Sequence, residues 1–205
     1  MTRARILDAA RGVFLAQGYA GTTMRAVAVA ARVSVPTLGL VFGTKAGLLK
    51  AAIDVAIAGD DEPVAVLDRG WARTAAAAQG VEPSLAVVVE VLAGAQERSA
   101  GLVMAALEGG RTHPDLAEVS ARLVGQRQVV AGWIVDRLRE RAGLRAGLSR
   151  AEPIETVWLL MEPALFVRMT RDRGRTTAQY RAWIVNAVRS LILPEHPDPE
   201  TSYEG

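Results

Sequence analysis

Apolar residues recur at helical spacing along almost the whole chain, and this periodicity constrains the fold more than any other feature. In residues 3–17, for example, Ile6, Ala10, Val13 and Phe14 share one face of a helix that Gly18 ends. We find no convincing run of alternating apolar and polar residues, the pattern that is typical of a strand. The sequence therefore predicts an all-α protein.

The predicted helices fall into two groups. Short helices over 3–17, 23–31, 35–42 and 45–58 form a compact first module, and longer ones follow over 63–79, 83–99, 101–109, 114–142, 149–172 and 177–193. The sequences SRAE (149–152) and TTAQ (176–179) have the form of capping boxes that start the last two helices, and Pro163 should kink the first of these. We therefore expect a small helical domain over residues 1–50, a larger one over 51–193, and a proline-rich, acidic, flexible tail over 194–205.

Charge is distributed unevenly between these two domains. Residues 1–50 contain seven basic residues and one acidic residue, a net charge of +6, whereas the remainder has 17 basic and 21 acidic residues, a net charge of −4. A basic first quarter indicates a surface for a polyanion such as nucleic acid, and the alternative is a solvated basic face. Charge alone does not separate these two interpretations.

Cysteine and histidine usage excludes several classes of site. The chain of 205 residues has no cysteine and only two histidines, so disulfides, thiolate metal sites and all-histidine metal sites are excluded. The N-terminus is charged where a signal peptide requires an apolar run, and no segment approaches the roughly eighteen uninterrupted apolar residues of a membrane span. We expect a soluble, cytoplasmic protein that binds no metal and no cofactor.

The common catalytic motifs are also missing. The sequence has no phosphate-binding loop, no dinucleotide-binding glycine pattern, no serine-hydrolase elbow and no zinc-protease motif. His113 with Asp115 and Glu118 can be sketched as a catalytic site, but the same residues suit a loop followed by a helix start. We therefore expect that the protein is not an enzyme.

Residues 23–45 carry the strongest local signal. A helix over 23–31, a turn of about three residues and a short helix over 35–42 have the order of a helix-turn-helix, in which the second helix lies in the major groove of DNA. Small residues such as Ala28 and Ala31 let the two helices pack closely, while Leu38 and Phe42 tie the second helix to the core. The start of each helix offers free amides to phosphate. The predicted DNA contacts are Arg25, Ser34, Val35, Pro36, Thr37, Gly39, Leu40, Thr44 and Lys45.

This chain resembles the TetR family of bacterial transcriptional regulators. The residues that carry the resemblance are Ile6, Ala9, Ala10, Phe14, Gly18, Tyr19, Thr22, Thr23, Val27, Ala28, Ala31, Val33, Ser34, Thr37, Leu38, Phe42, Lys45 and Leu48. The sequences TVWLLMEPALFVRMTRDRG and TAQYRAWIVNAVRSLIL are similar to the paired final helices of the family. The resemblance implies an N-terminal helix-turn-helix DNA-binding domain and a C-terminal domain that dimerises and holds a small molecule.

Two positions depart from the family pattern. The family usually has an aromatic residue where this chain has Gly39, and glycine in the turn where this chain has Arg32. Gly39 removes one anchoring contact with phosphate and costs the recognition helix about 0.5–1 kcal/mol relative to alanine. Arg32 would restore some attraction to phosphate if its side chain points toward the DNA.

In the larger domain, the same residues suit either a pocket or a packed core. We expect a largely apolar or aromatic effector, and the candidates for its contacts are Trp71, Met104, Glu108, Gln126, Trp133, Trp158, Met161 and Glu162. For each apolar candidate the alternative is plain core, and for each polar one a solvated surface. The last two helices are expected to pair with their copies in a four-helix bundle through Leu159, Leu165, Phe166, Trp183, Ile184, Val188 and Leu191.

The sequence therefore predicts a ligand-responsive, dimeric transcriptional regulator that binds an inverted repeat in double-stranded DNA. The resemblance favours a repressor over an activator. The alternative is a dimeric small-molecule-binding or scaffolding protein whose DNA binding is weakened by Gly39.

Overall fold

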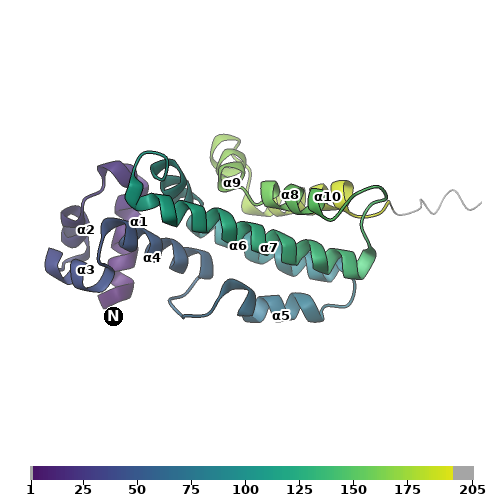
Figure 1. Cartoon of the computed structure of the whole chain (residues 1–205), viewed down its shortest axis with the longest axis horizontal. Helices are drawn as coiled ribbons and strands as arrows, with labels where there is room; N and C mark the ends of the chain where they lie inside the picture. The colour runs from purple at the N-terminus through teal and green to yellow at the C-terminus, as the bar shows by residue number, and fades with distance from the viewer. Residues whose placement is uncertain (1, 196–205) are drawn as a thin grey trace, which may run out of the picture.

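The computed structural model describes residues 2–195, which fold entirely into helices and connecting segments, without strands, so the predicted all-α class is confirmed (Figure 1). The elements are α1 (Thr2–Gly21), α2 (Met24–Ala31), α3 (Val35–Phe42), α4 (Lys45–Ala58), η1 (Val66–Asp68), α5 (Gly70–Ala77), α6 (Val81–Gly109), α7 (Pro114–Ala142), α8 (Ala151–Leu160), α9 (Pro163–Val167), the π-helical turn η2 (Arg168–Asp172) and α10 (Thr177–Ile192). Nearly all of the tail expected over 194–205 lies outside the described residues.

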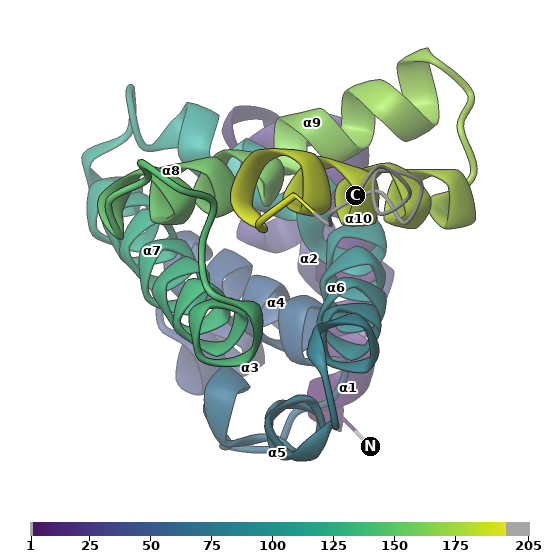
Figure 2. The same cartoon turned by 90° about the vertical axis from the view of Figure 1, so that its right-hand side faces the viewer.

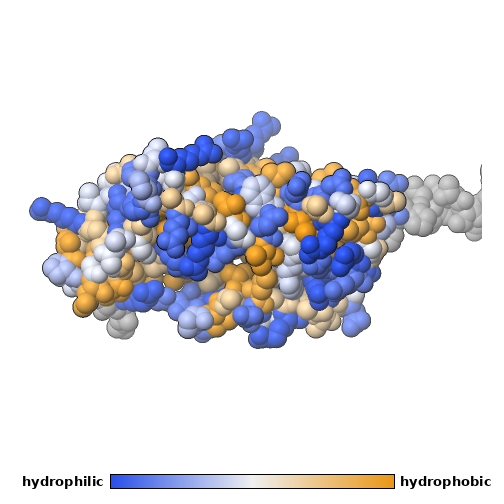
Figure 3. Space-filling model, in the orientation of Figure 1, coloured by the Kyte–Doolittle hydropathy of each residue, from blue (hydrophilic) through white to orange (hydrophobic). Residues whose placement is uncertain are grey.

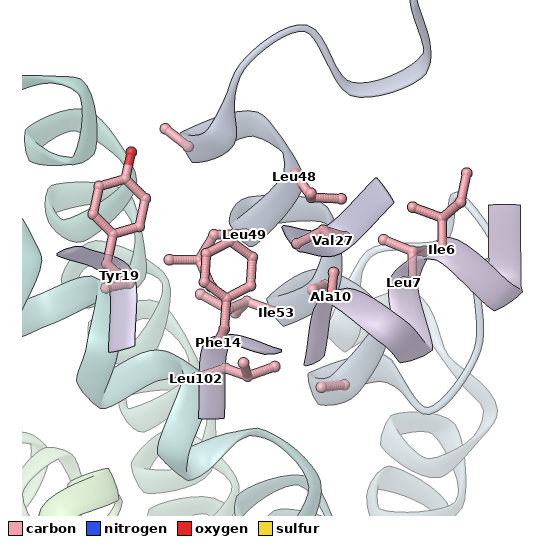
Figure 4. Close-up of a cluster of buried hydrophobic side chains, with 14 of the residues drawn as sticks. Ile6, Leu7, Ala10, Phe14, Tyr19, Val27, Leu48, Leu49, Ile53 and Leu102 are labelled. Carbon is pink, nitrogen blue, oxygen red and sulfur yellow. The ribbon is translucent and has the colours of Figure 1, made fainter. Parts of the chain in front are cut away.

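The first four helices form a small domain, which we call the head, at one end of the molecule (Figure 1). Its core gathers apolar side chains from α1, α2 and α4, and Phe14 of α1, Ile53 of α4 and Leu102 of α6 meet in its centre (Figure 4). Leu102 is fully buried although it belongs to the long helix α6. The head therefore shares its core with the rest of the protein, and the domain boundary expected at residue 50 falls inside α4.

A second core joins helices α5 to α10. The long antiparallel helices α6 and α7 run the length of the larger domain, with α8 and α10 across one side and α5 on the other (Figure 2). Tyr180 of α10 packs edge-on against Phe166 of α9, and its hydroxyl donates to the Leu160 carbonyl at 3.2 Å. Burial raises the pKa of this hydroxyl to about 12, so it remains a donor at neutral pH.

Two predicted helix boundaries are wrong. The helices expected over 83–99 and 101–109 are one continuous helix, α6, because Gly101 serves close packing: a β-carbon there would lie 2.6 Å from Leu15 of α1. The helix expected over 63–79 begins only at Gly70, after an irregular segment in which Arg69 pairs with Asp60.

The other predicted features at helix ends are confirmed in part. The helix expected over 149–172 breaks at Met161, and Pro163 starts α9, as the predicted kink requires. The capping box at Thr176 is complete. At 149–152 only half of the box forms, because the Glu152 carboxylate accepts from both the amide and the hydroxyl of Ser149.

Among residues 2–195, no single helix is long and apolar enough to cross a membrane. The bent pair α2–α3 is the one pair of helices in this range that meets the length and composition criteria together.

A substitution at Arg32 tests the backbone of the turn between α2 and α3. Arg32 has φ 53° and ψ 48°, and it is the one non-glycine residue with positive φ between residues 2 and 195. This left-handed conformation costs a residue with a β-carbon about 1–2 kcal/mol, and glycine avoids that cost. Part of the gain from glycine is offset because glycine loses more conformational entropy on folding. We expect Arg32→Gly to raise the free energy of unfolding in urea by about 0.5–1 kcal/mol. Arg32→Ala removes the same charge and should leave stability unchanged; an equal gain in both variants would attribute the effect to charge.

Candidate nucleic-acid interface and ligand cavity

Helices α2 and α3 have the geometry of a helix-turn-helix. They are inclined at 105° to one another, within the range of about 90–120° that this motif adopts. Arg32 ends α2 in the left-handed conformation, and Ser34 caps α3 by accepting from the Thr37 amide at 3.1 Å. Leu38 is fully buried and holds α3 against the core, so the opposite face of α3 is turned outward.

Three helix starts offer free amides on the head. Thr23 accepts from the Ala26 amide at 3.1 Å, and Thr44 accepts from the Gly47 amide at 3.0 Å, so α2 and α4 are capped in the same way as α3. Such starts bind phosphate because the other first-turn amides have no partner in the helix. The predicted DNA contacts are exposed at Arg25, Ser34, Val35, Pro36, Leu40 and Thr44 and half-buried at Thr37, Gly39 and Lys45.

Lys45 occupies a more constrained place than the sequence indicated. Its ammonium donates to the Tyr19 carbonyl at 2.9 Å and lies 4.0 Å from the centre of the Tyr19 ring. Arg25, by contrast, is exposed in the first turn of α2 and has no ion-pair or hydrogen-bond partner for its side chain within residues 2–195. Arg25 is therefore free to meet a phosphate, as is the Arg32 side chain, which is also exposed and has no ion-pair or hydrogen-bond partner within the described residues.

Tyr19 also joins the head to the turn between α6 and α7. Its hydroxyl donates to the Asp115 carboxylate, and its ring meets that of His113 edge-on, with the ring centres 5.2 Å apart. Burial first, and the adjacent carboxylate second, raise the pKa of Tyr19 above its ordinary value, so the donor stays protonated. The Nδ1 atom of His113 bonds with Thr112 and Gly109 of the same turn. His113 and Asp115, sketched above as a catalytic pair, here form a joint between domains.

A cavity of about 1150 Å³ lies in the larger domain, next to the head. Its walls come from α4, the segment 60–67, α5, the middle of α6, the first half of α7, and the break between α8 and α9. The lining is a mixture of apolar, basic and acidic side chains, and three of its basic residues pair with acidic ones that also line it: Arg3 with Asp61, Lys50 with Asp54, and Arg69 with Asp60. Arg98 donates to the carbonyls of Ala56 and Ile57 at the end of α4, whereas the Arg122 side chain has no partner among the described residues.

The cavity brings together three of the eight residues predicted to contact a ligand: Trp71, Gln126 and Met161. Three others lie directly behind its wall. Trp133 packs edge-on against Trp71, whereas Trp158 lies beneath the Arg127 guanidinium, which also pairs with Glu162 at 2.6 Å. Met104 and Glu108 lie on α6 outside the lining, where Met104 is half-buried and Glu108 exposed.

The predicted dimer residues divide into two sets. Leu159 of α8 is 58% exposed, and Trp183 and Leu191 of α10 are 38% and 52% exposed. Phe166, Ile184 and Val188 are buried in the core of the same chain, while Leu165 is half-buried. Only the exposed set can contact a partner without a change in the structure of the chain. The three buried residues pack within their own chain, and a sequence does not show which helix faces meet inside one chain.

The sequence of the head matches a known family. Residues 6–52 match the family model of bacterial regulatory proteins, tetR family. The N-terminal domain is a TetR-family domain. No curated protein sequence matches the chain.

The TetR-like fold extends over nearly the whole chain. One similar solved structure is the transcriptional regulator FadR from Bacillus subtilis in complex with stearoyl-CoA, at a TM-score of 0.69 and 14% identity over 89% of this chain and 95% of that one. Another is NalD, the secondary repressor of the MexAB-OprM multidrug efflux pump in Pseudomonas aeruginosa (0.68; 18%; 94% and 96%). A third is the TetR-family regulator CifR in complex with a 26-bp double-stranded operator DNA (0.66; 22%; 92% and 95%). The helix-turn-helix and the larger helical domain expected from the resemblance are thus confirmed.

Some residues of the TetR-like site carry no signal in the sequence. The partner of Tyr19, Asp115, is 96 residues away along the chain, and Arg127 differs in no visible way from other helical arginines. Gly39 lies in open space, because nothing approaches within 4 Å of the place where its β-carbon would be. A larger side chain therefore has room there, and its absence leaves the backbone of α3 accessible.

Proposed function

We propose that this chain is a transcriptional repressor that binds operator DNA as a homodimer and releases it when a small molecule occupies the cavity. The observation that carries the proposal is the head itself, a capped helix-turn-helix with an outward-facing α3 in a segment of net charge +6. NalD, which is a repressor, and CifR, which was solved in complex with operator DNA, share the fold and support repression and DNA binding.

The contacts with phosphate would come from the helix starts at Thr23, Ser34 and Thr44 and from Arg25. Lys45 joins them if a phosphate reaches its ammonium, which uses only one of its three donors on the Tyr19 carbonyl. Most of the affinity then comes from a few free cations and from the helix starts, and we expect a strong dependence on salt.

Dimerisation would use the exposed faces of α8 and α10, which lie side by side on one side of the larger domain (Figure 2). Leu159, Trp183 and Leu191 are large apolar residues that are partly exposed to solvent in the single chain. Pairing this face with its copy about a two-fold axis gives a four-helix bundle, as the sequence predicted. A symmetric dimer places two α3 helices on an inverted repeat, about 34–36 Å apart in successive major grooves.

The effector would bind in the cavity. Its volume of about 1150 Å³ is slightly above the range of about 300–1,000 Å³ that is usual for ligand pockets, and the structurally similar FadR was solved in complex with stearoyl-CoA. The walls suit a largely apolar molecule, and Arg122 offers its unpaired charge to an acidic group. Because α4 both lines the cavity and begins beside α3, a ligand that prefers one position of α4 would change the spacing of the two heads.

A second candidate is a dimeric small-molecule-binding or scaffolding protein that does not hold DNA. Two observations favour it: Gly39 supplies no side chain to grip the backbone of DNA, and the Lys45 ammonium faces Tyr19. Binding to DNA separates the two candidates directly.

DNA binding is tested with the purified chain and its own upstream DNA at several salt concentrations. We expect the logarithm of affinity to fall linearly with the logarithm of salt concentration, and Arg25→Ala to weaken binding for all sequences and reduce the slope by about 1. Arg173→Ala, which removes an exposed charge far along the chain from the head, is the control and should change neither quantity. Absence of binding at low salt would favour the second candidate.

The dimer face is tested with Leu191→Arg, which places a charge at a position that is exposed in the single chain. We expect the wild type to sediment at twice the mass of one chain at micromolar concentration, and the variant at the mass of one. Val124→Arg alters an exposed valine of α7, and it should leave the dimer intact. A monomeric wild type would contradict the proposed assembly.

Binding in the cavity is tested with anilinonaphthalene sulfonate, an apolar fluorophore that carries an acidic group. We expect saturable binding to the wild type, loss of binding in Ala95→Trp because the indole fills the cavity, and weaker binding in Arg122→Ala. Ala121→Trp adds the same ring on the exposed side of α7 and serves as the control. Equal fluorescence from all four proteins would show that the probe binds elsewhere.

A further inference from the structure

The outward face of α3 has an unusual chemistry for a helix that enters the major groove. The eight residues of α3 read VPTLGLVF and include no charged side chain and no side-chain amide. Thr37 alone among them has a side chain that forms hydrogen bonds, and its hydroxyl is bonded to that of Ser34 at 2.7 Å. The groups that usually recognise base edges are therefore missing.

Apolar groups occupy the outermost positions instead. Pro36 and Leu40 are four residues apart and lie opposite the buried Leu38, so they form one ridge on the outer side of α3. Leu40 is 90% exposed, the highest value among the exposed large apolar residues of the described chain. Apolar residues form patches on the lower part of the end that α3 occupies, next to polar ones (Figure 3). Beside this ridge, Gly39 leaves room for the helix to lie deep in a groove.

Each base pair offers a different set of groups in the major groove. Guanine pairs with arginine or lysine, adenine with asparagine or glutamine, and cytosine with an acidic residue, whereas thymine presents a methyl group that binds apolar side chains. Apart from the Thr37 hydroxyl, which does not distinguish between bases, the α3 sequence supplies only the last type of partner. The net charge of +6 on residues 1–50 still directs this face toward DNA rather than toward an apolar protein surface.

We infer that α3 recognises its operator through thymine methyl groups, which contact the ridge formed by Leu40 and Pro36. This inference rests on the proposed DNA binding and adds which chemical group of the DNA specifies the site. It makes Leu40 the main specificity-determining residue of the recognition helix. Operator half-sites then contain thymine at the positions that α3 covers, and phosphate contacts from Arg25 and the helix starts set the register.

The test begins with sites selected by the full-length chain from a randomised duplex library. Each thymine of the selected half-site is then replaced in turn by deoxyuridine, which differs only by the missing methyl group. We expect a loss of about fourfold in affinity for each contacted methyl, which corresponds to about 0.8 kcal/mol per buried carbon. Replacement outside the half-sites should have no effect.

The variant Leu40→Ala connects this loss to the protein. Leu40 is exposed, so the variant should fold normally, and the difference between thymine and deoxyuridine should nearly disappear at one position. Val124→Ala, which shortens an exposed valine of α7, should retain the full difference. Specific binding that is unchanged by deoxyuridine at every position would overturn the inference and assign recognition to DNA shape. If no sequence is selected at all, the proposed DNA binding itself fails, and the inference with it.

Discussion

The packing of α1 and α4 of the head against α6 is the interaction on which the rest of the structure depends. Phe14, Ile53 and Leu102 come from three helices and are almost completely removed from water. Burial of one such side chain contributes about 1.5–3 kcal/mol, a large part of the stability of a single domain. Because Leu102 of α6 is part of the head's core, the head is packed against the larger domain and is not connected to it by a linker alone. Its position is fixed by the same long helix that lines the cavity.

Local features of the sequence predicted local structure well. Thr23, Ser34 and Thr44 were expected to start helices, and each caps the helix that follows it. Pro163 interrupts its helix because a proline has no amide to donate and its ring needs space. These features act over a few residues, so a single sequence displays them completely.

Interactions between distant segments could not be predicted. The sequence predicts a break between residues 99 and 101, yet α6 continues through it, and Leu15 from another helix occupies the space beside Gly101. Contacts between distant segments also decide which of the predicted dimer residues are exposed. Ile184 and Val188 are apolar like Leu191, but only the fold shows that the first two face the chain's own core. In the cavity, Trp71 lines the wall, whereas Trp133 packs behind it, and the sequence gives no sign of this difference because both are apolar tryptophans.

Two helices, α4 and α6, both line the cavity and contribute to the head's core. In α6, Ser99 and Val103 line the cavity, and Val103 also belongs to the head's core together with Leu102 and Ala106. Gly101 brings this turn of α6 close to Leu15 of α1, so a displacement of the turn toward α1 meets a side chain of the head. A 100-fold change in DNA affinity requires a coupling of about 2.7 kcal/mol, which is comparable to the burial of one large apolar side chain. Under the proposed switch, a ligand that repacks this turn or the cavity side of α4 would have enough energy available to move the head, whereas one that contacts only α5 or the segment 60–67 does not reach the head's core.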